Sequence, residues 1–400
     1  MTADSELTEL TDWQRELRVH FPIITAHPEM AYLDSAATSQ KPRAVLDAVQ
    51  TYLTTTNANA GRGSYPWANH TTALVERTRQ RVKEFLGDPE PGRSRVHFTS
   101  GTTEGLRTVA RDWLPGHLAD GDEILVPFAD HRANLDPWLE AQRLLARQGV
   151  TVHLRELPYQ EPSGDYDHRA LAGVIGPRTR FVAVTHIHHV YGGDMNVQRI
   201  RDAVGPHVPI CLDAAQSIGH LPVSVDRLDV DFVVFSGHKA LALPGSGAVW
   251  ARNASERGPE FRPGGWNGTP NTVGITSLEA ALDWLDAAGT DRIARWTTAL
   301  TARLTEGLRR LLPYEILGCQ ASLAVGSTVQ RRHGIVTFRH RDIPSDDLGF
   351  ILYDHGFMVR ADNLCQAGTD KRDGSVRVSV HVYNTVEEID RLLTVLATLE

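Results

Sequence analysis

Short apolar runs alternate with amphipathic helical patterns between residues 95 and 250, and this alternation constrains the fold more than any other feature. Such an order is typical of a largely parallel sheet with helices on both faces. The sequence therefore predicts an α/β fold. The predicted strands are 96–98, 123–127, 151–154, 179–185, 209–213, 231–235 and 248–250, and the predicted helices between them are 102–113, 135–148, 169–175 and 197–204.

Polar residues follow most of these strands at the points where the strands end. In a parallel sheet, functional residues lie just beyond the carboxyl ends of the strands. We therefore expect one site that gathers residues from distant parts of the chain. The candidates at these positions are Ser100, Gly101, Thr102, Thr103, His131, His189, Asp213, Gln216, Ser236, His238 and Lys239.

Lys239 follows the apolar run 232–235 after a short turn. A buried ammonium is costly unless it is paired or used covalently. One chemistry that needs a lysine here is a Schiff base to pyridoxal 5′-phosphate (PLP), because partial desolvation frees the lone pair of the amine. The alternative is a lysine that reaches solvent from the end of a strand. This stretch alone leaves both interpretations open.

The turn after the predicted strand 96–98 carries Gly101, Thr102 and Thr103 at the start of a helix. Free N–H groups and the dipole of a helix favour an anion such as a phosphate, and threonine hydroxyls add donors. The alternative is an ordinary helix cap, which also favours Ser and Thr.

Further residues at the strand ends suit a PLP site. Asp213 can pair with a protonated pyridine nitrogen, Gln216 can hydrogen-bond the ring oxygen, and His131 can stack on the ring and relay protons. For Asp213 the alternative is a helix cap, and for His131 it is an ordinary loop histidine. The predicted phosphate ligands are Thr102, Thr103, Ser236 and His238.

A metal-dependent hydrolase is a competing interpretation, because histidines with carboxylates bind zinc or manganese. The residues concerned are Asp130, His131, His186, His188, His189, Asp213 and His238. They are spread over several strand ends, with no close pair of histidines on one helix. A metal site would also leave Lys239 and the Gly-Thr-Thr turn unexplained, so we predict no metal.

Composition excludes several classes of function. The chain has 400 residues, 41% of them hydrophobic, and a net charge of −8. This negative charge predicts that the chain has no general affinity for nucleic acid or anionic membranes. The polar, acidic N-terminus is not that of a signal peptide, and no 18-residue apolar window predicts a transmembrane helix. Three separated cysteines, Cys211, Cys319 and Cys365, suit a reducing cytoplasm.

Taken together, the motifs resemble those of PLP-dependent cysteine desulfurases in the class V aminotransferase group, in the branch shared with selenocysteine lyases. The resemblance covers nearly the whole chain. It is carried by residues 32–38, 98–105, 131–138, 213–216, 235–239, 268–272 and 383–385. It implies fold type I of the PLP-dependent transferases, with a large domain (31–285) around a mostly parallel seven-stranded sheet. A smaller α+β domain (286–400) would pack with residues 1–30.

The resemblance also implies roles for single residues. Lys239 would form the Schiff base, and Thr269 would reach the phosphate of the other subunit in a homodimer. Arg377 would bind the carboxylate of a small amino-acid substrate, with Arg360 and His189 beside it. Cys365 would take the sulfur as a persulfide and pass it to an acceptor protein.

Several departures from the family pattern affect the substrate end. The residues before Cys365 lack a glycine and two histidines of the family, and His189 replaces an asparagine. The connection 250–269 is short, and Tyr65 and Trp67 occupy a loop that often holds histidine. The alternatives are therefore another C–S lyase, an epimerase or an aminotransferase on a different amino acid, or a homologue without catalysis.

Overall fold

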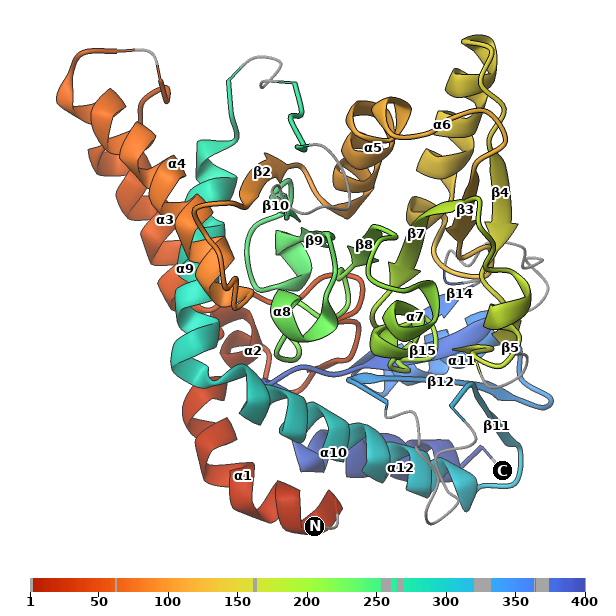
Figure 1. Ribbon diagram of the computed structural model, residues 1–400. Coiled ribbons are helices and arrows are strands. Elements are labelled where there is room, and N and C mark those ends of the chain that lie inside the picture. Colours follow the sequence, from red (N-terminus) through yellow and green to blue (C-terminus); the bar gives the residue numbers. More distant parts are fainter. Residues whose placement is uncertain are drawn as a thin grey trace.

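The structure is a computed structural model that describes residues 3–61, 63–160, 164–252, 260–264, 269–319, 332–362, 364 and 374–399. Its main sheet has seven strands in the order β2-β10-β9-β8-β7-β3-β4 (Figure 1). Only β10 runs antiparallel to its neighbours, β2 and β9. This confirms the predicted α/β fold. The strands are β2 (Arg95–Thr99), β3 (Glu123–Val126), β4 (His153–Glu156), β7 (Thr179–Thr185), β8 (Ile210–Asp213), β9 (Phe232–Ser236) and β10 (Gly247–Ala251).

The central strands are buried on both faces, which explains their continuous apolar runs. Successive side chains of a strand point to opposite faces of the sheet. In β9, Val233 and Phe235 belong to one hydrophobic core, whereas Phe232 and Val234 belong to the other. The sheet therefore separates two cores and needs helices on both sides.

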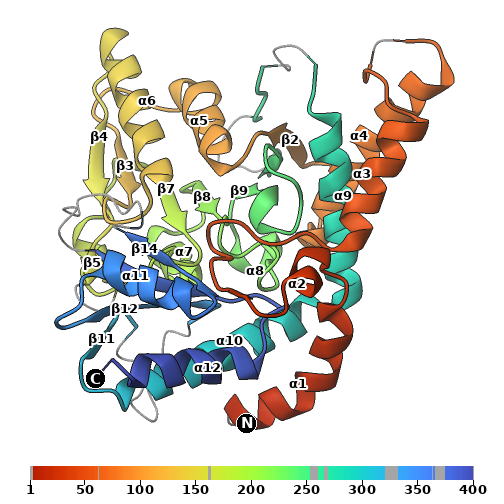
Figure 2. The ribbon, with the colours of Figure 1, turned by 180° about the vertical axis from the view of Figure 1, so that it is seen from behind.

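Helices α5 and α6 cover one face of the main sheet. Helices α3, α4, α7, α8 and α9 cover the opposite face, where α3, α4 and α9 lie side by side (Figures 1 and 2). Helix α5 lies so close to the sheet that a Cβ on Gly105 would collide with Val234. This close packing fixes the start of α5 relative to β9. The helices are α3 (Arg43–Thr55), α4 (Pro66–Phe85), α5 (Thr102–Asp112), α6 (Asp136–Arg147), α7 (Val197–Val204), α8 (Val225–Leu228) and α9 (Thr272–Ala288).

A second, antiparallel sheet has the order β11-β12-β15-β14 and packs against the C-terminal helices. Leu7 and Leu10 of α1 share its core with Trp296 and Leu392. The division into 1–30, 31–285 and 286–400 stays a prediction. The elements are α1 (Ala3–Arg18), α2 (Pro22–Ala26), α10 (Thr290–Arg309), β11 (Tyr314–Leu317), β12 (Ile335–His340), α11 (Ser345–Asp354), β14 (Arg360–Asp362), β15 (Ser375–Ser379) and α12 (Val386–Ala397).

An early segment of the chain joins the second sheet. Strand β1 (Ala31–Tyr32) pairs in parallel with β13 (Phe357–Met358), and Asp34 forms a bridge with Ser379 of β15. The hydroxyls of Ser35 and Tyr383 lie 2.7 Å apart. Residues 31–36 are thus held by residues more than three hundred positions later in the chain.

Some predicted elements are wrong. Residues 169–175 form only the 3₁₀ turn Leu171–Gly173 instead of a helix. Glycine is a poor helix former, and this stretch contains Gly173 and is followed directly by Gly176. The predicted strand 151–154 begins two residues later, at His153, and runs to Glu156. In the described ranges, no helix has the length and apolar character needed to cross a membrane.

Candidate active site

A cavity of about 270 Å³ lies at the carboxyl ends of β7, β8 and β9. Most residues predicted for the site line it, so the expected convergence at the strand ends is present in the geometry. They are Thr102, Thr103, His131, His189, Asp213, Gln216, Ser236, His238, Lys239, Arg360 and Arg377. Thr269 lines a different cavity, of about 450 Å³, and Cys365 lies outside the described residues.

Lys239 reaches the cavity from the 3₁₀ turn Gly237–Lys239, directly after β9. Burial lowers the pKa of its amine to about 8, and the negative charge of Asp213 partly opposes this shift. A lowered pKa leaves more of the amine neutral near pH 7, with its lone pair available. A buried amine with this pKa suits covalent chemistry on a carbonyl group.

The N-terminus of α5 forms one end of the cavity. Gly101 has a φ of +154°, and a Cβ there would lie 3.0 Å from the Oγ of Ser236, so this position favours glycine. The backbone N–H of Thr102 donates to the Oγ of Ser236 at 2.8 Å, and the two hydroxyls also lie 2.8 Å apart. N–H groups and hydroxyls at the start of a helix suit a phosphate.

Asp213 ends β8 inside the protein. Its Oδ1 accepts the N–H of Ala215 at 2.9 Å, but burial still raises the pKa of its carboxyl group to about 6. A buried carboxylate of this kind is stabilised by a cationic partner. Gln216, three residues on, donates its side-chain N–H to the carbonyl of Ala36 at 3.0 Å, which fixes the orientation of its amide.

His131 is neutral in the cavity. Burial, with a smaller contribution from the charge of Lys239, lowers its pKa to about 4. Its Nδ1 accepts the N–H of Ala133 at 3.0 Å, so the single proton of the neutral ring lies on Nε2. Its ring meets the ring of His189 edge to face at 4.9 Å between centroids.

His189 carries two unused polar atoms. The residue is only 5% exposed, and neither ring nitrogen has a hydrogen-bond partner among the described residues. Burial, followed by the charges of His188 and His131, holds its pKa well below the usual range. Because buried polar atoms normally have partners, these nitrogens are suited to contact a bound molecule.

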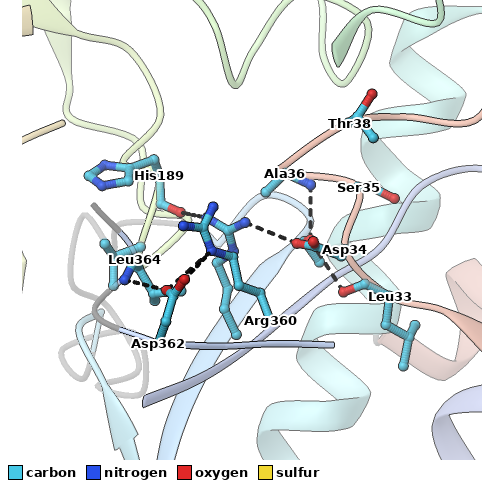
Figure 3. Close-up of polar contacts among 12 residues, drawn as sticks. Leu33, Asp34, Ser35, Ala36, Thr38, His189, Arg360, Asp362 and Leu364 are labelled. Atoms are coloured by element: carbon cyan, nitrogen blue, oxygen red, sulfur yellow. Dashed lines mark hydrogen bonds and ion pairs between the residues drawn. The ribbon is translucent and has the colours of Figure 1, made fainter. Parts of the chain in front are cut away.

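Two arginines on neighbouring strands of the second sheet also line the cavity. Arg377 of β15 donates to Asp34 Oδ1 at 3.0 Å and to the carbonyl of His189 at 3.1 Å, while its Nε has no partner in the described part of the chain. Arg360 of β14 pairs with Asp362, whose carboxylate also accepts the N–H of Leu364 (Figure 3). The two guanidinium groups suit a carboxylate.

Sequence reasoning missed Asp34 and did not predict the contacts of Asp130. The Nε2 of His188 lies 3.3 Å from Asp130 Oδ1, and the hydroxyl of Tyr166 donates to Oδ2 at 2.6 Å. This pair lies next in sequence to His131 and His189. In the ranges the structure covers, no group of three or more histidines, cysteines or carboxylates is arranged to hold a metal ion.

Comparison with known proteins adds the family. The sequence model of "Aminotransferase class-V" matches residues 31–392. A cysteine desulfurase of Cronobacter sakazakii is 32% identical over 408 residues, which cover 95% of this chain and 96% of the relative. A probable cysteine desulfurase of Vibrio cholerae is 31% identical over 406 residues, which cover 94% of this chain and 96% of the relative.

Solved structures agree with the sequence matches. A cysteine desulfurase of Escherichia coli has a TM-score of 0.79 at 27% identity, over 96% of this chain and 98% of that one. The apo cysteine desulfurase of Thermococcus onnurineus NA1 has a TM-score of 0.82 at 28% identity, over 96% of this chain and 97% of that one. The chain belongs to the class-V aminotransferase family. It is an enzyme, and its cofactor is PLP.

The residues present fit this cofactor. The lowered pKa of Lys239 suits an amine that reacts with an aldehyde, and the raised pKa of Asp213 marks a carboxylate that needs a cation such as a protonated pyridine. A Cβ on Gly101 would crowd the hydroxyl of Ser236, and the N–H groups and hydroxyls at this turn suit a phosphate. The unpartnered atoms of His189 and Arg377 remain available for a substrate.

Proposed function

We propose that the enzyme is a cysteine desulfurase, which converts L-cysteine to alanine and transfers the sulfur to Cys365 as a persulfide. The Cβ–S bond of cysteine breaks, an S–S bond forms on Cys365, and a proton takes the place of sulfur on Cβ. The cavity that brings Lys239, Asp213 and Arg377 together carries this proposal. The names of the relatives support the choice of reaction.

Bound PLP supplies an electron sink for the electrons released at the substrate Cα. Asp213 would hold the pyridine nitrogen in its protonated state, and His131 would stack on the ring and move protons through Nε2. Thr102, Thr103, Ser236 and His238 would bind the phosphate. Burial, together with the charges of Lys239 and Lys41, lowers the pKa of His238 to about 4, so it would act as a neutral ligand.

The substrate carboxylate would bind at the arginine end of the cavity. Among the described residues the Nε of Arg377 has no hydrogen-bond partner, and Arg360 lies on the adjacent strand. Asp34 and the carbonyl of His189 hold the guanidinium of Arg377 from two sides, so it is oriented before the substrate arrives. Preorganised donors lose little entropy on binding.

The assembly and location are part of the proposal. We place the enzyme in the cytoplasm as a homodimer in which Thr269 reaches the phosphate of the partner subunit. Thr269 lines the second cavity and not the cavity of its own Lys239, which fits a residue that acts across an interface. A sulfur-acceptor protein would take the persulfide from Cys365.

The reaction is tested with PLP-loaded protein and L-cysteine, by measuring alanine and protein-bound persulfide. We expect Cys365→Ala to stop both, because only a thiolate can accept the sulfur. Cys319→Ala is the matched control. Burial raises the pKa of the Cys319 thiol to about 11, and Cys319 does not line the cavity, so this variant should behave like the wild type.

Other outcomes would change the proposal. Equal release of alanine by the wild type and Cys365→Ala would make Cys365 a bystander and the enzyme a C–S lyase that needs no thiol. No reaction with cysteine despite bound PLP would contradict the desulfurase assignment, and the altered substrate end would then serve another amino acid.

A second prediction concerns His189. We expect His189→Phe to raise the KM for the amino acid about tenfold, because one hydrogen bond to a charged group contributes about 1.5–3 kcal/mol. His189→Asn keeps a donor and should stay closer to the wild type. Cofactor content should not change in either variant. An equal rise of KM in both variants would show that the imidazole contributes shape and not a hydrogen bond.

A further inference from the structure

Donors converge on one carbonyl group next to Lys239. The carbonyl oxygen of His238 accepts from the hydroxyl of Thr38 at 3.2 Å and from the backbone N–H and hydroxyl of Ser39, both at 3.0 Å. The ammonium of Lys41 donates to the same oxygen at 3.1 Å. A carbonyl oxygen has two lone pairs, so this acceptor is saturated.

The ammonium of Lys41 donates mainly to backbone carbonyl groups. Its other acceptors are the hydroxyl of Thr38, at 3.4 Å, and the carbonyl of Ser39. Within the described ranges, no carboxylate lies at ion-pair distance from it. Burial lowers the pKa of its ammonium to about 8. A partly buried cation without a counter-ion is costly, so its position indicates a specific task.

Residues 38–41 also hold the chain on the other side of Lys239. The hydroxyl of Ser39 accepts the N–H of Leu241 at 2.9 Å. Leu241 is fully buried and has a φ of +66°, a conformation that a leucine adopts only when its surroundings impose it. Ser39 therefore fixes the backbone both before and after Lys239.

We propose that Lys41, together with Ser39, is a positioning residue that fixes the main chain of Lys239 so that its amine meets the aldehyde of PLP. This inference rests on the proposed role of Lys239. In the step concerned, the amine of Lys239 adds to the aldehyde carbon, a C=N bond forms and water leaves. Lys41 touches neither PLP nor substrate, because it does not line the cavity.

The test compares three single variants of the full-length protein. Lys41→Met removes the ammonium but keeps the length of the side chain, and Lys41→Arg restores a charged donor. Lys83→Met is the matched control. Lys83 also donates to two carbonyls, those of Pro91 at 2.6 Å and Ser94 at 2.9 Å, but neither carbonyl belongs to the turn that carries Lys239.

PLP is added to the apo forms, samples are reduced with borohydride at successive times, and mass spectrometry measures the fraction of Lys239 peptide that carries the cofactor. We expect Lys41→Met to slow this capture about tenfold, since small displacements of a reacting group have effects of this size or larger. Lys41→Arg should recover most of the rate, and Lys83→Met should match the wild type. Thermal unfolding midpoints show whether each variant is folded.

Capture at the wild-type rate by a folded Lys41→Met variant would overturn the proposal, and so would equal slowing in Lys83→Met. If Lys41→Met does not fold, Ser39→Ala removes another donor to the same carbonyl and should slow capture in the same way; unchanged capture there would also overturn the proposal. A wild-type protein that captures PLP on a residue other than Lys239 would contradict the proposed function itself.

Discussion

Lys239→Ala is expected to lose covalent attachment of PLP completely. Alanine has no amine, and among the lysines the structure describes, Lys239 is the one that lines the cavity. The absorbance of the lysine-bound cofactor should disappear, and borohydride should fix no PLP to the chain. Activity should fall by several orders of magnitude, as it does when a covalent catalyst loses its reacting group.

The control for this prediction is Lys83→Ala, which removes a lysine outside the cavity and should keep the wild-type spectrum. Lys239→Ala should still bind PLP non-covalently, because Thr102, Ser236 and Asp213 remain. A Lys239→Ala protein that kept the absorbance of the lysine-bound cofactor would show that the site assignment is wrong.

The second large effect is expected at Arg377. Loss of its guanidinium should raise the KM for the amino acid about 100-fold, because a charged, two-point contact with a carboxylate contributes about 3 kcal/mol. PLP content should stay near the wild-type level, since Arg377 lies on β15 of the second sheet, whereas the proposed phosphate ligands lie at or just beyond the ends of strands of the main sheet. Steady-state kinetics measure the KM, and the absorbance of the bound cofactor measures the PLP content.

Asp34 determines how this experiment is designed. Partial burial raises the pKa of Asp34, and Arg377 opposes the rise, so removing the arginine alone would leave an unpaired, partly buried carboxyl group. The informative comparison is therefore Asp34→Asn against Asp34→Asn with Arg377→Met. The double variant should lose most of its affinity for the substrate, whereas Asp34→Asn keeps a side-chain oxygen that can hold the guanidinium and should lose much less. Equal loss of PLP and substrate in the double variant would contradict the carboxylate role.

Local patterns made the main sheet predictable. Buried strands such as β7 and β9 contain continuous apolar runs, 181–184 and 232–235, because helices cover both faces of the sheet. Parallel strands also bring their carboxyl ends to one edge, so Asp213 and Lys239 could be expected in one site before any distance was known.

The contacts that complete the site could not be predicted, because they depend on how distant segments dock. Asp34 and Arg377 are 343 positions apart, and no local pattern indicates that they pair. Nor does any sequence pattern show that the carboxylate of Asp130 pairs with His188 and accepts a hydrogen bond from the hydroxyl of Tyr166. Strand β11 is short and only partly buried, so its sequence has no clear alternation.

The docking of residues 31–36 onto the second sheet has a consequence for the order of folding. These residues leave the ribosome early, but their partners in β13, β15 and Tyr383 are made near the end of synthesis. The main sheet uses residues 95–251 and can form before that. The arginine end of the cavity is therefore assembled last, and a nascent chain that lacks its final part has no completed substrate site.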